Sequence, residues 1–193
     1  MAEHFDIVIA GGGPVGAALA LGLRGSAHRV ALLDARLRNA SADDARMIAL
    51  SHGSRLLLER LGVWRSLSDI TPIRHIAVSQ QRRFGRAELS AADAGVPALG
   101  YVASYAALQR ALIAALAGGR EEVMAGCTAR EVTGAAREAA VSVDCAGVTR
   151  HLTARLVVIA DGGESLRLTH VNERDYGQSA LVCDVASDQP HQN

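Results

Sequence analysis

The first 34 residues alternate between apolar runs of strand length and one segment of helical character. Residues 5–10 form a short apolar run with β-branched side chains, which predicts a buried strand. A glycine-rich stretch follows at once, and residues 17–24, rich in Ala and Leu, predict a helix that ends at Gly25. Residues 30–33 predict a second buried strand, which ends in Asp34. The pattern therefore predicts one βαβ unit with parallel strands.

The rest of the chain predicts two more helices and a series of short strands. The helices are expected over 51–61 and 104–117, because leucines recur on one face of the second and glycines end both. Apolar or alternating runs predict strands at 72–79, 123–133, 139–145, 149–153, 156–160 and 182–185. Residues 36–46 and 80–100 are polar and predict irregular structure. The uninterrupted apolar run at 156–160 is typical of a central strand.

Composition removes several classes of function. With 49% hydrophobic residues, the chain can form a sizeable core. Lys plus Arg and Asp plus Glu are both 20, so the net charge of zero gives no electrostatic basis for nucleic-acid binding. The three cysteines, Cys127, Cys145 and Cys183, are odd in number and contain no CxxC. We therefore expect neither a disulfide framework nor a metal site, and a cytoplasmic location.

The glycine-rich stretch after the first strand fits the pattern G-x-G-x-x-G through Gly11, Gly13 and Gly16. The first glycine allows a tight turn, the second lets the backbone approach a pyrophosphate, and the third lets helix and strand pack closely. Pro14 suits the first helical turn, and free N–H groups around Val15 would face the phosphates. The motif predicts a dinucleotide site, and the alternative is a glycine-rich turn without a ligand.

Asp34 closes the second strand at close to the expected spacing of roughly 20 residues beyond the glycines. A carboxylate there accepts hydrogen bonds from ribose hydroxyls and would repel a 2′-phosphate, although Arg36 and Arg38 lie nearby in the sequence. This favours FAD or NAD over NADP at this site, and the βαβ unit alone does not decide between the first two.

The order of the later elements favours FAD. A simple NAD domain would continue with further βα units, whereas this chain continues through inserted helices and a meander of short strands. We predict an α/β protein with a Rossmann-like FAD-binding fold of the glutathione-reductase type, with inserted β elements. The FAD-binding domain is expected at 1–70 and 101–170, and the start of a substrate domain at 71–100 and 171–193.

Three local sequences resemble the FAD-dependent aromatic hydroxylases of ubiquinone biosynthesis. They are D-A-R-M-I-A-L-S-H-G-S at 44–54, L-Q-R-A-L at 108–112 and A-D-G-G-E-S-L-R at 160–167. The resemblance implies that Arg46, Gln109, Asp161 and Gly162 contact the flavin nucleotide. The alternatives are a solvated surface arginine, an exposed helix glutamine and an ordinary turn aspartate. Residues 175–182 and 190–193 are similar to segments that enter the substrate region in the 2-octaprenyl-6-methoxyphenol branch of this family.

The family resemblance also implies a chemistry. NAD(P)H would reduce bound FAD, and the reduced flavin would use O2 to hydroxylate a prenylated phenol, with no catalytic side chain and no metal identified from the sequence. Other proteins of ubiquinone biosynthesis are compatible partners, and the membrane-soluble substrate implies peripheral contact with the inner membrane. The family's third motif, Gly-Asp followed by Ala-Ala-His, has no match here. We therefore expect an N-terminal fragment that is inactive and binds FAD weakly. An FAD-linked reductase, a halogenase or a non-catalytic nucleotide-binding module are the alternative functions.

Overall fold

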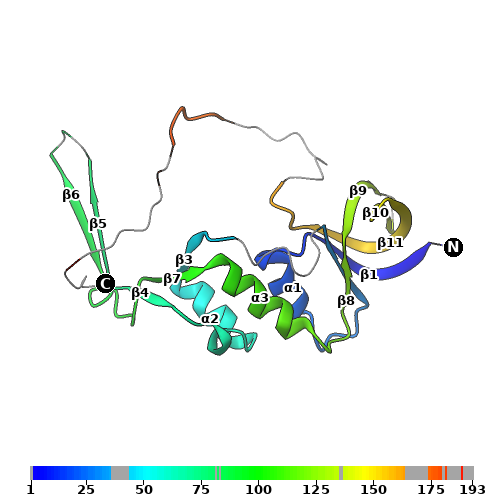
Figure 1. The fold of residues 1–193 in the computed structure, drawn as a ribbon, viewed down its shortest axis with the longest axis horizontal. Coiled ribbons are helices and arrows are strands. Elements are labelled where there is room, and N and C mark those ends of the chain that lie inside the picture. Colours follow the sequence, from blue (N-terminus) through cyan, green and yellow to red (C-terminus); the bar gives the residue numbers. More distant parts are fainter. Residues whose placement is uncertain are drawn as a thin grey trace.

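A computed structural model describes residues 2–35, 44–80, 82, 84–134, 137–163, 174–179, 181 and 188. The chain has one mixed six-stranded sheet with helices on one face, a smaller three-stranded sheet and a projecting hairpin (Figure 1). The predicted α/β class is confirmed in this arrangement, since the main sheet carries a parallel, Rossmann-like βαβ core.

The main sheet has the strand order β8-β2-β1-β11-β10-β9. Its members are β1 (Glu3–Ala10), β2 (Val30–Asp34), β8 (Glu122–Ala125), β9 (Cys127–Gly134), β10 (Ala139–Cys145) and β11 (Val148–Ile159). Strands β8, β2, β1 and β11 run parallel, whereas β10 and β9 are antiparallel to their neighbours. The predicted βαβ unit is confirmed, and it brings the carboxyl ends of β1, β2 and β11 to one edge of the sheet.

Two hydrophobic clusters cover the two faces of this sheet. One joins Ile9 and Leu32 to the leucine face of α3 (Tyr105–Leu116) and to α1 (Pro14–Gly22). The other joins Phe5 and Leu33 to the β9–β10–β11 meander. The central strands are apolar throughout because each of their faces packs against one of these layers.

The second sheet has the strand order β3-β7-β4, and none of its three strands was predicted with its observed bounds. Its strands are β3 (Met47–Ser51), β7 (Gly100–Ser104) and β4 (Thr71–Ile73). The helix α2 (His52–Arg60) follows β3, and the short 3₁₀ helix Trp64–Ser66 follows α2. Neither β3 nor β7 was predicted, because a five-residue strand is too short to carry a clear period of its own. Pairing with each other, rather than local preference, defines them.

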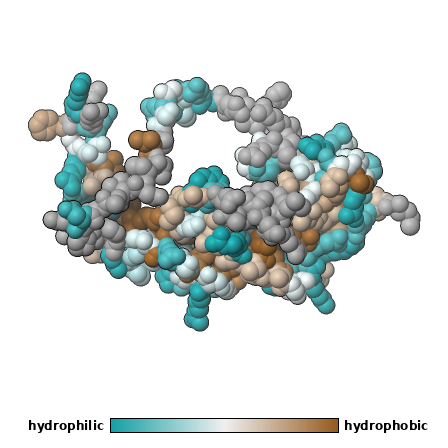
Figure 2. Space-filling view, in the orientation of Figure 1, coloured by the Kyte–Doolittle hydropathy of each residue, from teal (hydrophilic) through white to brown (hydrophobic). Residues whose placement is uncertain are grey.

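The predicted irregular segment 80–100 is wrong, because it contains β6 (Arg86–Ser90) and the start of β7. β6 pairs with β5 (His75–Ser79) in a hairpin that projects from the body of the protein (Figure 1). Ile76, Val78 and Leu89 are exposed on it, and hydrophobic side chains lie among hydrophilic ones on this arm in Figure 2.

The predicted strands at 149–153 and 156–160 are one continuous strand, β11. The prediction of a central strand is confirmed, since β11 lies between β1 and β10. Leu156 and Ile159 are nevertheless exposed at its carboxyl end. The predicted strand at 182–185 lies outside the described residues.

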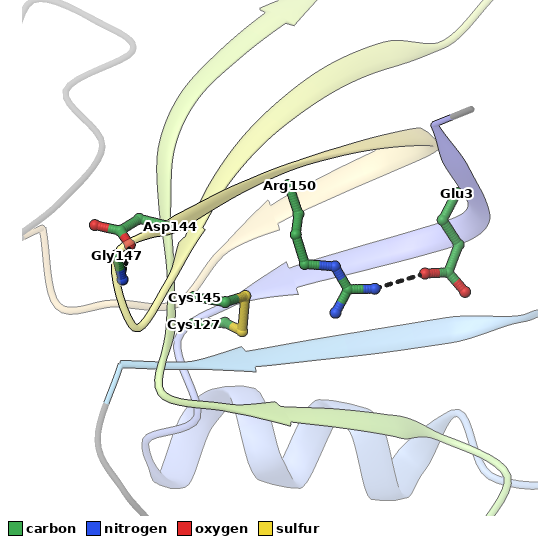
Figure 3. Close-up of a disulfide and its surroundings, with 6 residues drawn as sticks. All are labelled: Glu3, Cys127, Asp144, Cys145, Gly147 and Arg150. Atoms are coloured by element: carbon green, nitrogen blue, oxygen red, sulfur yellow. Dashed lines mark hydrogen bonds and ion pairs between the residues drawn. A yellow bond between two sulfur atoms is a disulfide. The ribbon is translucent and has the colours of Figure 1, made fainter.

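The expectation of reduced cysteines is wrong, because Cys127 and Cys145 form a disulfide between β9 and β10 (Figure 3). The two residues are register partners across the antiparallel pair, with Cα atoms 4.1 Å apart. Their separation of 18 residues resembles no motif. Only the hairpin register, which the turn at 145–148 fixes, brings the sulfurs together.

Candidate dinucleotide-binding site

A cavity of about 710 Å³ opens at the carboxyl ends of β1, β2 and β11, where α/β sheets of this type bind ligands. The residues around it come from the glycine turn, the end of β2, the segment before β3, the first residue of α3, the start of β9 and the end of β11. They are Gly11, Gly12, Gly13, Pro14, Val15, Leu33, Asp34, Ala35, Arg46, Tyr105, Cys127, Thr128, Ala129, Arg130, Ala160, Asp161 and Gly162. Eight of the ten residues predicted from the sequence are among them, and Gly16 and Gln109 support the glycine turn from behind.

The glycine turn is packed so closely that side chains cannot be added to it. Gly11 has φ +117°, and a Cβ there would lie 2.4 Å from the carbonyl oxygen of Ala160 at the end of β11. A Cβ on Gly16 would lie 1.9 Å from the carbonyl oxygen of Gly11. The predicted roles of these two glycines in turn and helix packing therefore agree with the geometry.

Asp34 lies directly against the turn. A Cβ on Gly12 would meet the Asp34 side chain, at 2.5 Å from its Cβ and 2.7 Å from Oδ2. The Gly11 N–H donates to the Leu33 carbonyl at 2.9 Å, which fixes the end of β2 beside the turn. Asp34 is nearly buried, at 8% exposure, and borders the cavity. The sequence did not single out Gly12, although its lack of a side chain is what lets the carboxylate sit here.

The amino end of α1 points its backbone donors into the same cavity. Gly13 is the N-cap, makes no side-chain capping bond, and is followed by Pro14 in the first turn. The first turn carries no acidic residue. Peptide N–H groups at a helix start lack partners in the helix and bear the positive end of its dipole, so this edge of the cavity favours an anion such as a diphosphate.

Gln109 is buried beneath the turn, at 2% exposure, so an exposed helix glutamine is excluded. Its Nε2 donates to the carbonyl oxygen of Gly12. That acceptor fixes the amide orientation, since the reverse would set two oxygens against each other. Among the described residues its Oε1 meets no donor. Gln109 thus supports the turn and leaves one buried acceptor beside it, and its contact with a flavin stays a prediction.

Arg46 and Tyr105 form the wall across from the turn. The Arg46 guanidinium pairs with Asp44 at 2.6 Å and lies over the Tyr105 ring, 4.6 Å from its centroid. The Tyr105 N–H also donates to the Arg46 carbonyl at 2.9 Å. The hydrogen bonds that Arg46 donates to Asp44 raise the pKa of Arg46 beyond its ordinary value, so the guanidinium stays charged. The sequence analysis did not predict Tyr105, whose ring packs against this cation.

Asp161 and Gly162 follow β11 and lie close to Gly11. Asp161 Oδ1 accepts the N–H of Gly163 at 2.8 Å, and Gly162 has φ +77°. Asp161 therefore stabilises its own turn, as the alternative of an ordinary turn aspartate predicts. It also borders the cavity.

The start of β9 closes the cavity beyond Asp34. Residues 127–130 line it, although none was predicted as a site residue. β8 pairs with β2 so that Ala125 is the partner of Asp34, and the chain then turns at Gly126 into β9. Only the tertiary structure brings this segment to the carboxyl end of β2, and no motif marks it in the sequence.

These residues fit FAD or another dinucleotide. The turn has no Cβ where a diphosphate would approach, the helix start supplies N–H donors, and a buried carboxylate lies beside both. Within the described part of the chain no three His, Cys, Asp or Glu side chains are arranged to hold a metal ion. No helix among the described residues is long and apolar enough to cross a bilayer.

Comparison with known proteins agrees with this geometry. The model of the FAD binding domain family matches residues 4–191. The ubiquinone hydroxylase UbiM of Neisseria meningitidis is 30% identical over 95% of this chain and 42% of its own length. The 3-demethoxyubiquinol 3-hydroxylase of Escherichia coli is 35% identical over 58% of this chain and 30% of its own length.

A solved structure has the same fold. OxyS anhydrotetracycline hydroxylase from Streptomyces rimosus superposes with a TM-score of 0.67 at 22% identity, over 83% of this chain and 32% of that one. The chain thus spans less than half the length of the two curated relatives and of this structure.

Proposed function

This chain belongs to the FAD-binding domain family, and from that premise we propose that it binds the ADP half of FAD in the cavity. We further propose that it is part of a monooxygenase that hydroxylates a prenylated phenol. The substrate class follows from the names of the two curated relatives, which act in ubiquinone hydroxylation. When bound, FAD supplies the redox chemistry that activates O2 with electrons from NAD(P)H.

The residues of the cavity divide the work of holding this cofactor. The N–H groups after Gly13 bind the diphosphate, and Asp34 accepts hydrogen bonds from the adenosine ribose. Arg46 and Asp161 hold the far side of the diphosphate and the ribityl chain, with Gly162 allowing close approach. Gln109 holds the glycine turn. The single observation that carries this assignment is that the Asp34 side chain lies against Gly12, next to the amino end of α1.

The domain division is part of the same proposal. Residues 1–70 and 101–170 build the FAD-binding domain, and 71–100 with 171–193 begin the substrate domain. The projecting β5–β6 hairpin belongs to the second unit and carries exposed apolar side chains suited to a membrane-soluble substrate. We assign the protein to peripheral contact with the inner membrane, because its proposed substrate dissolves there.

The binding claim is tested with the 193-residue chain, FAD and ADP. Isothermal titration of the wild type is compared with Asp34→Asn and with Asp93→Asn, whose side chain is exposed and outside the cavity. Asp34→Asn removes a charged acceptor, so affinity for both ligands falls about tenfold, a loss of about 1.4 kcal/mol. Wild-type chain that binds neither ligand refutes the proposal.

Hydroxylation is tested separately, with the longest protein that the gene encodes. Purified protein receives FAD, NADH or NADPH and a prenylated phenol under ¹⁸O2. Mass spectrometry of the product is expected to show one ¹⁸O atom. A product without the label excludes a monooxygenase even where FAD binds.

A further inference from the structure

The wall at the start of β9 faces the part of the cavity that lies beyond the ribose-binding carboxylate. In ADP the base, ribose and diphosphate follow in line, so a diphosphate at the glycine turn and a ribose at Asp34 place the base past Asp34. Residues 127–130 are the described residues that border the cavity on that side. The base therefore meets β9, and this inference rests on the proposed function.

Arg130 occupies a β-bulge in that wall. Ala129 pairs with Val143 and Glu131 pairs with Ser142, which leaves Arg130 as the extra residue. Cys127, Ala129 and Val132 pack into the core. The spacing between core-facing residues is therefore two before the bulge and three across it. Bulges turn a side chain out of the regular alternation, and they are enriched next to binding sites. Arg130, whose side chain is 61% exposed, is among the residues that line the cavity.

Asp144 holds this guanidinium in place. Its Oδ2 accepts from Arg130 Nη2 at 2.8 Å, and its Oδ1 accepts the N–H of Gly147 at 2.8 Å. The hydrogen bonds from Arg130 and from that turn hold the pKa of Asp144 below its usual value. The carboxylate therefore stays charged, and it uses one of the five guanidinium N–H groups.

The disulfide fixes the position of both residues. Figure 3 shows the Cys127–Cys145 bond beside Asp144 and the turn at Gly147. Cys145 follows Asp144 on β10, and Cys127 opens the wall that Arg130 continues on β9. The cross-link ties the two strand ends together, and the Arg130–Asp144 pair joins the same two strands.

We propose that Arg130 binds the adenine base of the dinucleotide, with its guanidinium plane against the base, and that Asp144 is the positioning residue that holds it there. A planar cation stacks well on an aromatic face, and it retains donors for the ring nitrogens at the base edge. Arg130 thus makes the cavity selective for an adenine nucleotide over a diphosphate alone.

The experiment is an isothermal titration of the 193-residue chain with ADP, FAD and inorganic pyrophosphate. Arg130→Gln weakens ADP and FAD about threefold to thirtyfold, the range measured for cation–aromatic contacts, and changes pyrophosphate binding by less than twofold. Arg150→Gln is the matched control, because Arg150 is also a partly exposed arginine in an ion pair, with Glu3 at 3.0 Å, outside the cavity. It leaves all three affinities unchanged.

The role of Asp144 is tested by a double-mutant cycle. Asp144→Asn weakens ADP binding in the wild type and has no further effect in Arg130→Gln, since it acts through that arginine. A purely structural role would give the same loss in both backgrounds, and that result overturns the positioning role. ADP affinity of Arg130→Gln within twofold of wild type overturns the binding role, whereas wild-type chain that binds no ADP shows that the proposed function has failed.

Discussion

Replacing Gly12 with alanine should weaken both nucleotide binding and folding. The new Cβ would lie 2.5 Å from Asp34 Cβ, about 0.9 Å inside the shortest ordinary contact of 3.4 Å. β2 is buried at every position and paired on both edges, so its backbone cannot move away. Rotation of the Asp34 side chain does not move its Cβ, so the glycine turn must shift away from β2, which costs about 1–3 kcal/mol of folding free energy as overpacking.

The same shift separates the turn from the carboxylate that we propose binds the ribose. A hydrogen bond to a charged group is worth about 1.5–3 kcal/mol, so affinity for ADP and FAD should fall about tenfold to a hundredfold. Isothermal titration and thermal unfolding measure the two effects separately.

Gly22→Ala is the control for the substitution itself. A Cβ at Gly22 meets only Leu61 Cδ2, at 3.9 Å, and the residue ends the same helix. It should leave affinity unchanged and raise stability by up to about 1 kcal/mol. If Gly12→Ala binds ADP as well as Gly22→Ala does, Asp34 does not hold the ribose from the observed position.

Three further outcomes are expected. Gln109→Leu leaves the buried Gly12 carbonyl without its donor, so urea unfolding should show a loss of about 1–3 kcal/mol, and an unchanged unfolding free energy would show that this bond does not support the turn. The denatured, unreduced chain should titrate one thiol because two of its three cysteines are bonded, and Cys145→Ala should lower the free energy of unfolding by about 3 kcal/mol for a loop of 18 residues; three titratable thiols would contradict the disulfide. The pKa of Asp6 is lowered chiefly by the N–H of Arg29, and that of Asp144 chiefly by Arg130, so each stabilises the fold above its ordinary pKa of 3.8 and ceases to do so as pH falls through its lowered value. Urea midpoints followed from neutral pH down to about pH 2 should therefore fall less steeply in Asp144→Asn than in wild type, and parallel curves would argue against this coupling.

Parts of the fold follow from local pattern. The βαβ unit, α2, α3 and the hairpin turn at 144–147 lie close to where periodicity and glycines predict them. Here local preference and the tertiary structure agree, because apolar strands and a leucine-faced helix have one way to bury their surfaces. The glycine turn and Asp34 were also predicted from local pattern, since both lie within the first 34 residues.

Other strands have no local signal. β3, β6 and β7 are five residues long, and each is defined by the strand it pairs with. Their absence from the prediction reflects non-local hydrogen bonding, which a run of five residues does not encode by itself.

The amino-acid sequence alone determined the diphosphate turn, its acidic partner and the fold class, because strand, turn, helix and strand are contiguous and their spacing sets their geometry. Only the tertiary structure decided the β9 wall, the Cys127–Cys145 bond, the support of Arg46 by Tyr105 and the burial of Gln109 under Gly12. Those contacts join residues between 18 and 97 positions apart or on separate elements. Chain connectivity does not constrain such distances, so sheet register and helix packing had to fix them.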